Sequence, residues 1–307
     1  IGIDFTLFNS KLTGSIDGYW NNTKDMLSTK NISLCTGYGS LTVNDGKLRT
    51  TGYEIQVIYH GNAGDFNYDL DMNLSHYKSV LKAMADPDYL YEYGASRTYV
   101  GGEIGEFWAY KTAGIFQSEA EVKEWNKAHG YRDDNGDWQP LQPVAKPGDI
   151  RFVDQNGDGM LDSNDKVKMG SGTPKVALAF NINLEYKNFD LVANFYGHFG
   201  VKRYNYTKYQ LQRMDQVFNS GKDALRAWTP TNTNTDVPRA VQGDPNKNGR
   251  SSDRFIENGG FLRLNNLQLG YNAPASFCKK LGLASLRVYI GGTRLLTFTK
   301  YKGYDPS

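Results

Sequence analysis

The sequence is poor in the residues that build disulfide or metal-held frameworks. Its 307 residues include 2 cysteines, Cys35 and Cys278, and 4 histidines. Two cysteines cannot supply the disulfide framework of a small secreted domain. No run of about 18 apolar residues occurs, which excludes a transmembrane helix. The net charge is +2 and no run of like charge stands out, so nucleic acid is not an expected partner.

Aromatic residues and glycine are abundant instead. Aromatic residues make up 13% of the sequence, with 21 Tyr, and 33 Gly supply sites for turns. The clearest pattern runs from Val176 to Phe199, where apolar residues alternate with polar or small ones in two arms joined at Lys187 and Asn188. A period of two places alternate side chains on opposite faces of a strand. We therefore predict a β-hairpin with one apolar and one polar face, with Val192 as a misfit.

Each arm of this hairpin has about a dozen residues, which is long for a soluble sheet and close to the length of a bilayer-crossing strand. A strand in the wall of a water-filled barrel needs an apolar side toward lipid and tolerates polar residues toward the lumen. One sheet of a large soluble β protein gives the same local pattern. The hairpin alone leaves both interpretations open.

The connections distinguish between these interpretations. Six further strands are predicted, at residues 1–8, 12–20, 47–60, 66–76, 261–273 and 285–298. The connections between successive strands are alternately short and long, and the long ones cover residues 23–46, 78–172 and 201–254. Outer-membrane barrels have short periplasmic turns and long extracellular loops, whereas soluble sandwiches need no such alternation. The pattern predicts an all-β fold, a transmembrane antiparallel β-barrel with long extracellular loops.

The strand directions indicate that the chain is one part of a barrel. If the short turns are periplasmic, the eighth predicted strand runs outward and Ser307 lies in an extracellular loop. Single-chain bacterial barrels have an even number of strands and both ends inside. We therefore expect residues 1–307 to form the C-terminal portion of one larger barrel domain, without its final strand. Two helices are predicted inside the long loops, one capped by Ser118 and Glu121 and one near residues 209–218.

Four groups of residues carry a more specific signal. They are Gly148–Asp154 with Asn156–Gly159, Trp228–Pro230 with Asn234–Arg239, Arg254–Glu257 with Phe261–Leu264, and Leu295–Tyr301 with Gly303–Pro306. In this order they resemble the SusC/RagA-type TonB-dependent outer-membrane transporters of Bacteroidetes. The first half of the chain matches more loosely, through residues 12–15 and 24–27.

This resemblance implies a barrel of 22 strands with a plug domain, a SusD-like surface lipoprotein as partner, and energy supplied by TonB. The plug, the TonB box and the final strand are not expected within residues 1–307. The implied function is import of an oligomeric nutrient, an oligosaccharide or a peptide, across the cell outer membrane. A passive porin and a soluble β-rich glycan-binding or adhesin module are the alternatives. Nothing in the sequence supports an enzyme, and the residues do not identify the nutrient.

Residues 154–165 match a twelve-residue calcium loop. Oxygen ligands are available at positions 1, 3, 5, 9 and 12, a carbonyl at position 7, and Gly159 provides the sharp turn at position 6. The last position is Asp where an EF-hand has Glu, and flanking helices are not predicted. We predict a structural Ca²⁺ site, and the alternative is an Asp/Gly-rich turn closed by side-chain-to-backbone hydrogen bonds. The predicted ligands are Asp154, Asn156, Asp158, the Met160 carbonyl, Asp162 and Asp165.

The other candidate residues have more ordinary interpretations. The two cysteines are predicted on opposite sides of the membrane, too far apart for a disulfide. His60 and His76 fall near strand ends, where interfacial positions are expected, and Asp133–Asp137 is predicted as a turn rather than a second cation site. Aromatic residues of the long loops are expected to pack against each other, although they also suit contacts with sugars or peptides; they include Tyr89, Tyr91, Tyr93, Trp108, Trp125, Trp138, Tyr204, Tyr206 and Tyr209.

The alternation also assigns side chains to the two sides of the predicted barrel wall. Apolar positions are expected to face lipid and polar positions the lumen, because only the lumen is wet. The predicted lipid-facing residues include Leu70, Met72, Leu178, Phe180, Ile182 and Leu191, and the predicted lumen-facing residues are Asn67, Asp69, Asp71, Asn181, Asn183 and Glu185.

Overall fold

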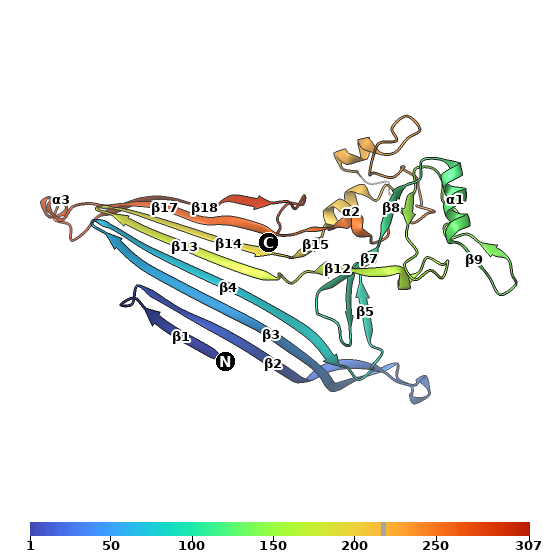
Figure 1. The fold of residues 1–307 in the computed structure, drawn as a ribbon, viewed down its shortest axis with the longest axis horizontal. Coiled ribbons are helices and arrows are strands. Elements are labelled where there is room, and N and C mark those ends of the chain that lie inside the picture. Colours follow the sequence, from blue (N-terminus) through green and yellow to red (C-terminus); the bar gives the residue numbers. More distant parts are fainter. Residues whose placement is uncertain (216–218) are drawn as a thin grey trace.

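A computed structural model describes residues 1–215 and 219–307 of the chain, and its largest element is one antiparallel sheet of eight strands. The strands pair in the order β1-β2-β3-β4-β13-β14-β17-β18 (Figure 1). The eight strands predicted from the sequence are therefore confirmed, each beside its neighbour in the chain. Their bounds are β1 (Gly2–Leu7), β2 (Leu12–Asn31), β3 (Ser40–Ala63), β4 (Phe66–Ala83), β13 (Val176–Tyr186), β14 (Phe189–Phe199), β17 (Phe261–Asn272) and β18 (Arg287–Thr299).

The short connections lie together at one end of the sheet and the long ones at the other (Figure 1). The β13–β14 turn is as tight as predicted, with Lys187 at a φ of 54°. The connection between β17 and β18 contains a short helix, α3 (Ala275–Lys280), that the sequence pattern did not predict. Its last turn carries Lys279 and Lys280, which suit the negative end of a helix.

The first predicted loop, residues 23–46, is mostly paired strand. β2 and β3 continue their ladder as far as the pair Asn31 and Ser40, with irregularities near Met26. Only residues 32–39 are irregular, and they contain the 3₁₀ turn η1 (Leu34–Thr36). Polar residues occupy both faces of this extension, so the alternation that marks a strand beside an apolar phase is missing there. β4 likewise extends to Ala83, beyond the predicted start of the second loop at residue 78.

The other two long connections fold together, and we call the described residues within 84–175 and 200–260 the loop unit. Its strands are short and form a four-stranded sheet, β12-β7-β6-β5, and three strand pairs. These strands are β5 (Leu90–Tyr93), β6 (Ser96–Tyr99), β7 (Glu106–Tyr110), β8 (Thr112–Ile115), β9 (Tyr131–Arg132), β10 (Trp138–Gln139), β11 (Ile150–Phe152), β12 (Lys166–Ser171), β15 (Lys202–Tyr204) and β16 (Ile256–Asn258). The helical elements are α1 (Glu119–His129), α2 (Tyr206–Gln212), η2 (Ser163–Asp165), η3 (Lys222–Arg226) and η4 (Asp253–Phe255).

The helix predicted after Ser118 is confirmed as α1. The Ser118 side chain accepts a hydrogen bond from the backbone N–H of Glu121, and the Glu121 carboxylate accepts one from the backbone of Gln117. These bonds satisfy amides that a helix start leaves unpaired. The second predicted helix begins earlier than expected, as α2, and of its predicted span residues 216–218 lie outside the described residues.

Most of the fully buried large side chains lie in the loop unit rather than in the large sheet. Phe116, Phe152 and Phe255 are completely buried there. The apolar face of the sheet is open by comparison, with Met72 36% and Ile290 74% exposed. An exposed apolar surface of this extent marks a face that contacts another apolar phase.

No helix among the described residues is long and apolar enough to cross a membrane. The two cysteines are free, as predicted, with Cys35 exposed in η1 and Cys278 buried in α3.

The face assignment predicts the effect of a charge near the middle of β13. Ile182→Arg in the intact protein should lower the free energy of unfolding by about 2–4 kcal/mol, because the charge would enter hydrocarbon. Asn183→Arg is the matched control, since it places the same side chain on the polar face. Denaturant titration of the protein in lipid vesicles measures both. A harmless Ile182→Arg beside a destabilising Asn183→Arg would show that the two faces are reversed.

Candidate functional site

A ladder of polar side chains crosses one face of the large sheet. The register pairs Asn181 with Asp71 on one side and with Asn194 on the other, and Asn194 with Asn266. Asn181 donates to the Asp71 carboxylate at 3.1 Å, Asn194 donates to Asn181 at 2.8 Å, and Asn266 donates to Asn194 at 3.2 Å. Four neighbouring strands are thus joined by side chains as well as by backbone.

The opposite face carries the apolar residues of the same strands. Leu70 pairs with Ile182, and Met72 with Phe180, which itself pairs with Phe195. The register therefore separates the predicted apolar set from the predicted polar set, whose members Asp69 and Asn183 are also paired. That the apolar set faces lipid stays a prediction.

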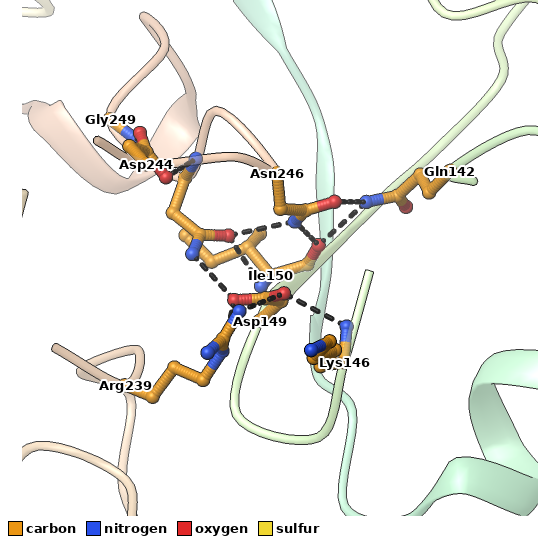
Figure 2. Close-up of polar contacts among 9 residues, drawn as sticks. Gln142, Lys146, Asp149, Ile150, Arg239, Asp244, Asn246 and Gly249 are labelled. Carbon is orange, nitrogen blue, oxygen red and sulfur yellow. Dashed lines mark hydrogen bonds and ion pairs between the residues drawn. The ribbon is translucent and has the colours of Figure 1, made fainter. Parts of the chain in front are cut away.

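Asp149 is the centre of the loop unit. Its side chain is completely buried and forms a two-point ion pair with Arg239, whose Nε and Nη2 donate at 2.7 and 3.0 Å (Figure 2). The carboxylate also accepts hydrogen bonds from the Asn248 amide at 2.9 Å and from the backbone N–H of Lys146 at 2.9 Å. A buried carboxylate is tolerated only when it is paired in this way.

Side-chain amides extend the Asp149 cluster along β11 (Figure 2). The carbonyl of Ile150 accepts from Gln142 at 2.9 Å and from Asn246 at 3.0 Å, and the N–H of Ile150 donates to Asn248 at 2.8 Å. Gln142 also accepts from the N–H of Phe152 at 2.9 Å. These bonds tie β11 to a segment almost 100 residues away, so the two long connections fold as one body.

Gly148 occupies a position in the 148–154 motif that requires glycine. Its φ is +90°, and a Cβ at this position would lie 2.5 Å from the Trp228 ring and 2.8 Å from Cβ of Arg239. Trp228 donates through Nε1 to Gln117 at 2.8 Å. The quoted motifs at 148–154, 228–230 and 234–239 therefore meet in one buried cluster.

A second cluster fastens the loop unit to the end of the sheet. Arg263 of β17 is buried and donates to Asp305 at 2.6 Å, and Arg203 of β15 donates to the carbonyl of Pro306 at 3.1 Å. Glu257 accepts from Lys208 at 3.1 Å and from the backbone of Lys302 at 3.1 Å. Burial opposes ionisation of Glu257, but these hydrogen bonds outweigh it and lower its pKa. The quoted motifs at 254–257, 261–264 and 303–306 meet here.

Glu106 is a buried polar residue that the sequence pattern did not reveal. It is 2% exposed and accepts hydrogen bonds from Trp108 at 2.9 Å, the backbone of Glu103 at 3.0 Å and Lys168 at 2.6 Å. Burial raises the pKa of Glu106, but the bonds from Lys168 and Trp108 prevail and lower it. Asn246 and Asn248 were missed as well, because their short Asp/Asn/Gly-rich stretch resembles any exposed turn.

The predicted calcium loop is closed by hydrogen bonds to its own backbone. Asp154 accepts from the N–H groups of Gly157 and Gly159 at 2.7 and 2.8 Å, and Asp165 accepts from those of Gln155 and Asp162 at 2.8 and 2.9 Å. Asn156, Asp158, Met160 and Asp162 lie along the same loop, with Asp158 accepting from the N–H of Met160 at 2.8 Å. In the described residues no group of three or more carboxylate, histidine or cysteine side chains converges tightly enough to hold a metal.

The electrostatics of this loop suit a cation nonetheless. Asp165 is completely buried, and burial together with the negative charges of Asp154 and Asp158 raises its pKa, although two backbone donors oppose this. A bound Ca²⁺ would remove that repulsion, and oxygen is the ligand that Ca²⁺ prefers. Calcium binding by this loop therefore stays a prediction.

Most loop aromatics pack against other side chains. Tyr204 and Tyr209 surround Phe255, and Trp108 lies between Tyr99 and the Arg97 guanidinium. Others are exposed, at 55% for Tyr91, 77% for Tyr93, 45% for Trp138 and 60% for Tyr206.

The predicted turn at 133–137 is held by Asp133, which accepts from the backbone of Asn135 and of Asp137. His60 pairs with Asp69 at 2.6 Å, and the His76 ring lies 5.6 Å from that of Tyr53.

Comparison with known proteins identifies the type of chain. TonB-dependent receptor P3 of Formosa agariphila is 34% identical over 316 residues, which cover 100% of this chain and 30% of that receptor. TonB-dependent receptor SusC of Bacteroides thetaiotaomicron is 29% identical over 314 residues, which cover 99% of this chain and 29% of SusC. No family model matches the chain.

The fold agrees with these relatives. The RagAB peptide transporter superposes with a TM-score of 0.75 at 24% identity, over 99% of this chain and 31% of the transporter chain. The RagAB peptide importer in its open-open state gives a TM-score of 0.75 at 25% identity. The chain is of the SusC/RagA type.

The resemblance drawn from the motifs is thereby confirmed, and so is the fold class, a segment of the type of β-barrel that these relatives form. The SusC/RagA-type chain spans about three tenths of the length of the relatives it matches. The proteins compared are named receptors, transporters or importers, which fits the expectation that the chain is not an enzyme.

The calcium prediction is tested by titration of the intact protein. Ca²⁺ at millimolar concentration should bind to the 154–165 loop and protect it from proteolysis, and Asp158→Ala should abolish this effect because it removes a predicted ligand from an exposed position. Asp134→Ala, an equal loss of charge in the neighbouring exposed turn, is the control. Equal calcium responses in the two variants would exclude the loop as the site.

The Asp149 cluster predicts a local loss of stability. Asp149→Ala leaves the half-buried Arg239 guanidinium without its carboxylate and the Asn248 amide without its acceptor, so the loop unit should be destabilised by about 3 kcal/mol. Hydrogen exchange of residues 142–153 and 236–249 in the intact protein measures this, and the exchange of β13 and β14 should not change. Asp236→Ala, which removes a 77% exposed partner of Arg226, should have little effect. Unchanged protection in Asp149→Ala would contradict the role of the cluster.

Proposed function

We propose that the protein containing this chain imports oligomeric nutrients across the outer membrane with energy from TonB. The observation that carries the proposal is the arrangement of the sheet. One face is apolar and largely open, the other carries a polar ladder, and the long connections gather at one end. A transmembrane barrel with a wet lumen and an extracellular vestibule requires this arrangement. The names of the TonB-dependent relatives support the same function.

The loop unit supports a partner on the extracellular side. Its described residues include the buried polar side chains Asp149 and Glu106 with their partners, whereas a passive pore needs no such structure at its mouth. Its exposed aromatic side chains include Tyr91 and Tyr93. Aromatic residues are enriched in protein interfaces and suit contacts with sugars or peptides. We propose that a SusD-like surface lipoprotein covers residues 84–175 and 200–260 as a lid, and that this lid opens and closes during transport.

A cavity of about 370 Å³ between the loop unit and residues 302–304 helps to choose between the substrate classes. Its lining includes Lys222 and Arg226 together with Asp223 and Asp236. Side chains of both signs suit a peptide, whose termini and side chains carry both charges, better than a neutral glycan. RagAB, which shares the fold, is named as a peptide transporter. A peptide is therefore the substrate we favour, with an oligosaccharide as the alternative.

The proposal predicts a dependence on TonB. Uptake of labelled oligopeptides by cells that carry the intact protein should stop when TonB is deleted, because the outer membrane has no nucleotide supply to drive transport. Purification in mild detergent should recover a lipoprotein in about equal amount. Labelled neutral oligosaccharides of similar size serve as the comparison for substrate class. A protein that purifies alone and passes solute equally well without TonB would instead be a porin.

A further inference from the structure

A second cavity, of about 740 Å³, lies where the large sheet meets the loop unit, and its lining is strongly basic. The sheet contributes Tyr53, His76 and Lys78, and the loop unit contributes Lys168, Lys175 and Lys202. Glu103 is the one acidic residue among the lining residues. None of these residues belongs to the Asp149 cluster, the calcium loop or the cavity described above.

The sheet residues of this cavity belong to the apolar face. Along β4, alternate positions on that face read Leu70, Met72, Leu74, His76 and Lys78. The face thus passes from aliphatic to aromatic to cationic toward the loop unit, with Tyr53 of β3 directly opposite His76. This order is the one expected where a barrel surface leaves hydrocarbon and enters the headgroup layer.

The lysine side chains are held in place by two glycines with positive φ. A Cβ at Gly170, whose φ is +129°, would lie 2.6 Å from Cγ of Lys202. A Cβ at Gly200, whose φ is +69°, would lie 2.8 Å from Cβ of Lys175. The aliphatic stems of both lysines therefore pass close to bare backbone, and both lysines line the same cavity.

The charges of these lysines are not all neutralised. Lys168 pairs with Glu106 at 2.6 Å, and Lys78 lies 4.0 Å from Glu103. Within residues 1–215 and 219–307, Lys175 and Lys202 form no ion pair, and Lys175 is exposed. Lys175 and Lys202 thus line a roomy cavity without an ion-pair partner among the described residues, and Glu103 is associated with Lys78 instead.

We propose that this cavity binds the phosphate group of a lipid headgroup on the outward side of the barrel, through Lys175 and Lys202 with Lys78 at its edge. A phosphate supplies the missing negative charge, and acyl chains attached to it would continue along the apolar face below His76. The inference goes beyond the proposed import function and uses only the membrane orientation of the sheet. The TonB deletion experiment therefore tests the import function and not this lipid site.

The test is binding of fluorescent monophosphoryl lipid A to the intact protein in detergent, compared with its dephosphorylated analogue. The double variant Lys175→Ala/Lys202→Ala should bind roughly tenfold to thirtyfold more weakly. The reason is that each lysine near an anionic headgroup strengthens binding roughly fivefold. Lys123→Ala/Lys127→Ala, an equal loss of charge at exposed positions of α1, is the matched control and should bind like the original protein. Lys175→Arg/Lys202→Arg should retain binding, which separates charge from a folding defect.

Three results would overturn the proposal. Equal binding of the phosphorylated and dephosphorylated lipids, or equal loss in the two alanine double variants, would exclude a phosphate site at these lysines. Inorganic phosphate that binds as tightly as the lipid, and displaces it, would show a site for a soluble anion rather than for a headgroup.

Discussion

Alternation of side chains across a pleated backbone is the constraint on which the large sheet depends. Because the period is two, a slip of β13 by one residue against β4 would move Asn181 to the apolar face and Ile182 to the polar one. The ladder from Asp71 to Asn266 opposes such a slip, since its hydrogen bonds form only in the observed register. The sheet can therefore present one continuous apolar surface and one wet surface along long strands.

The loop unit is organised differently, around buried polar groups. Asp149 brings charge into the interior, which costs desolvation energy. Its two-point pairing with Arg239 and its hydrogen bonds from Asn248 and the Lys146 amide compensate for that cost. Such a cluster is satisfied in only one arrangement, so it selects how two distant loops meet. Under the proposed import function, this single arrangement would keep the vestibule rigid.

The parts predicted from sequence are those whose signal is local. The hairpin at 176–199 and helix α1 were found because a repeating pattern or a cap at Ser118 lies within a dozen residues. The paired extension within 23–46 was expected as a loop, because polar residues on both faces of β2 and β3 erase the alternation. The short helix α3 was not predicted, because it is too short to show a helical repeat in the sequence.

The contacts that build the loop unit carry no local signal. Asp149 meets Arg239, and Glu106 meets Lys168, across long separations in sequence, and no periodicity marks such partners. The motifs around Asp149 were recognised through their family resemblance, but Gln142, Asn246 and Asn248 stood outside those motifs. The predicted calcium loop differs, because its ligand pattern is local and clear in the sequence. The same side chains also close the turn by hydrogen bonds to its backbone, so the pattern fits either role.

Spin labels placed one at a time from position 178 to position 185 of the intact protein in lipid vesicles test the central claim most directly. Accessibility to dissolved oxygen should be high at the even positions, which include Phe180 and Ile182, and accessibility to a water-soluble nickel complex should be high at the odd positions. Both profiles should alternate with a period of two and with opposite phase. Equal accessibility of all positions to the nickel complex would contradict a sheet with one face in lipid.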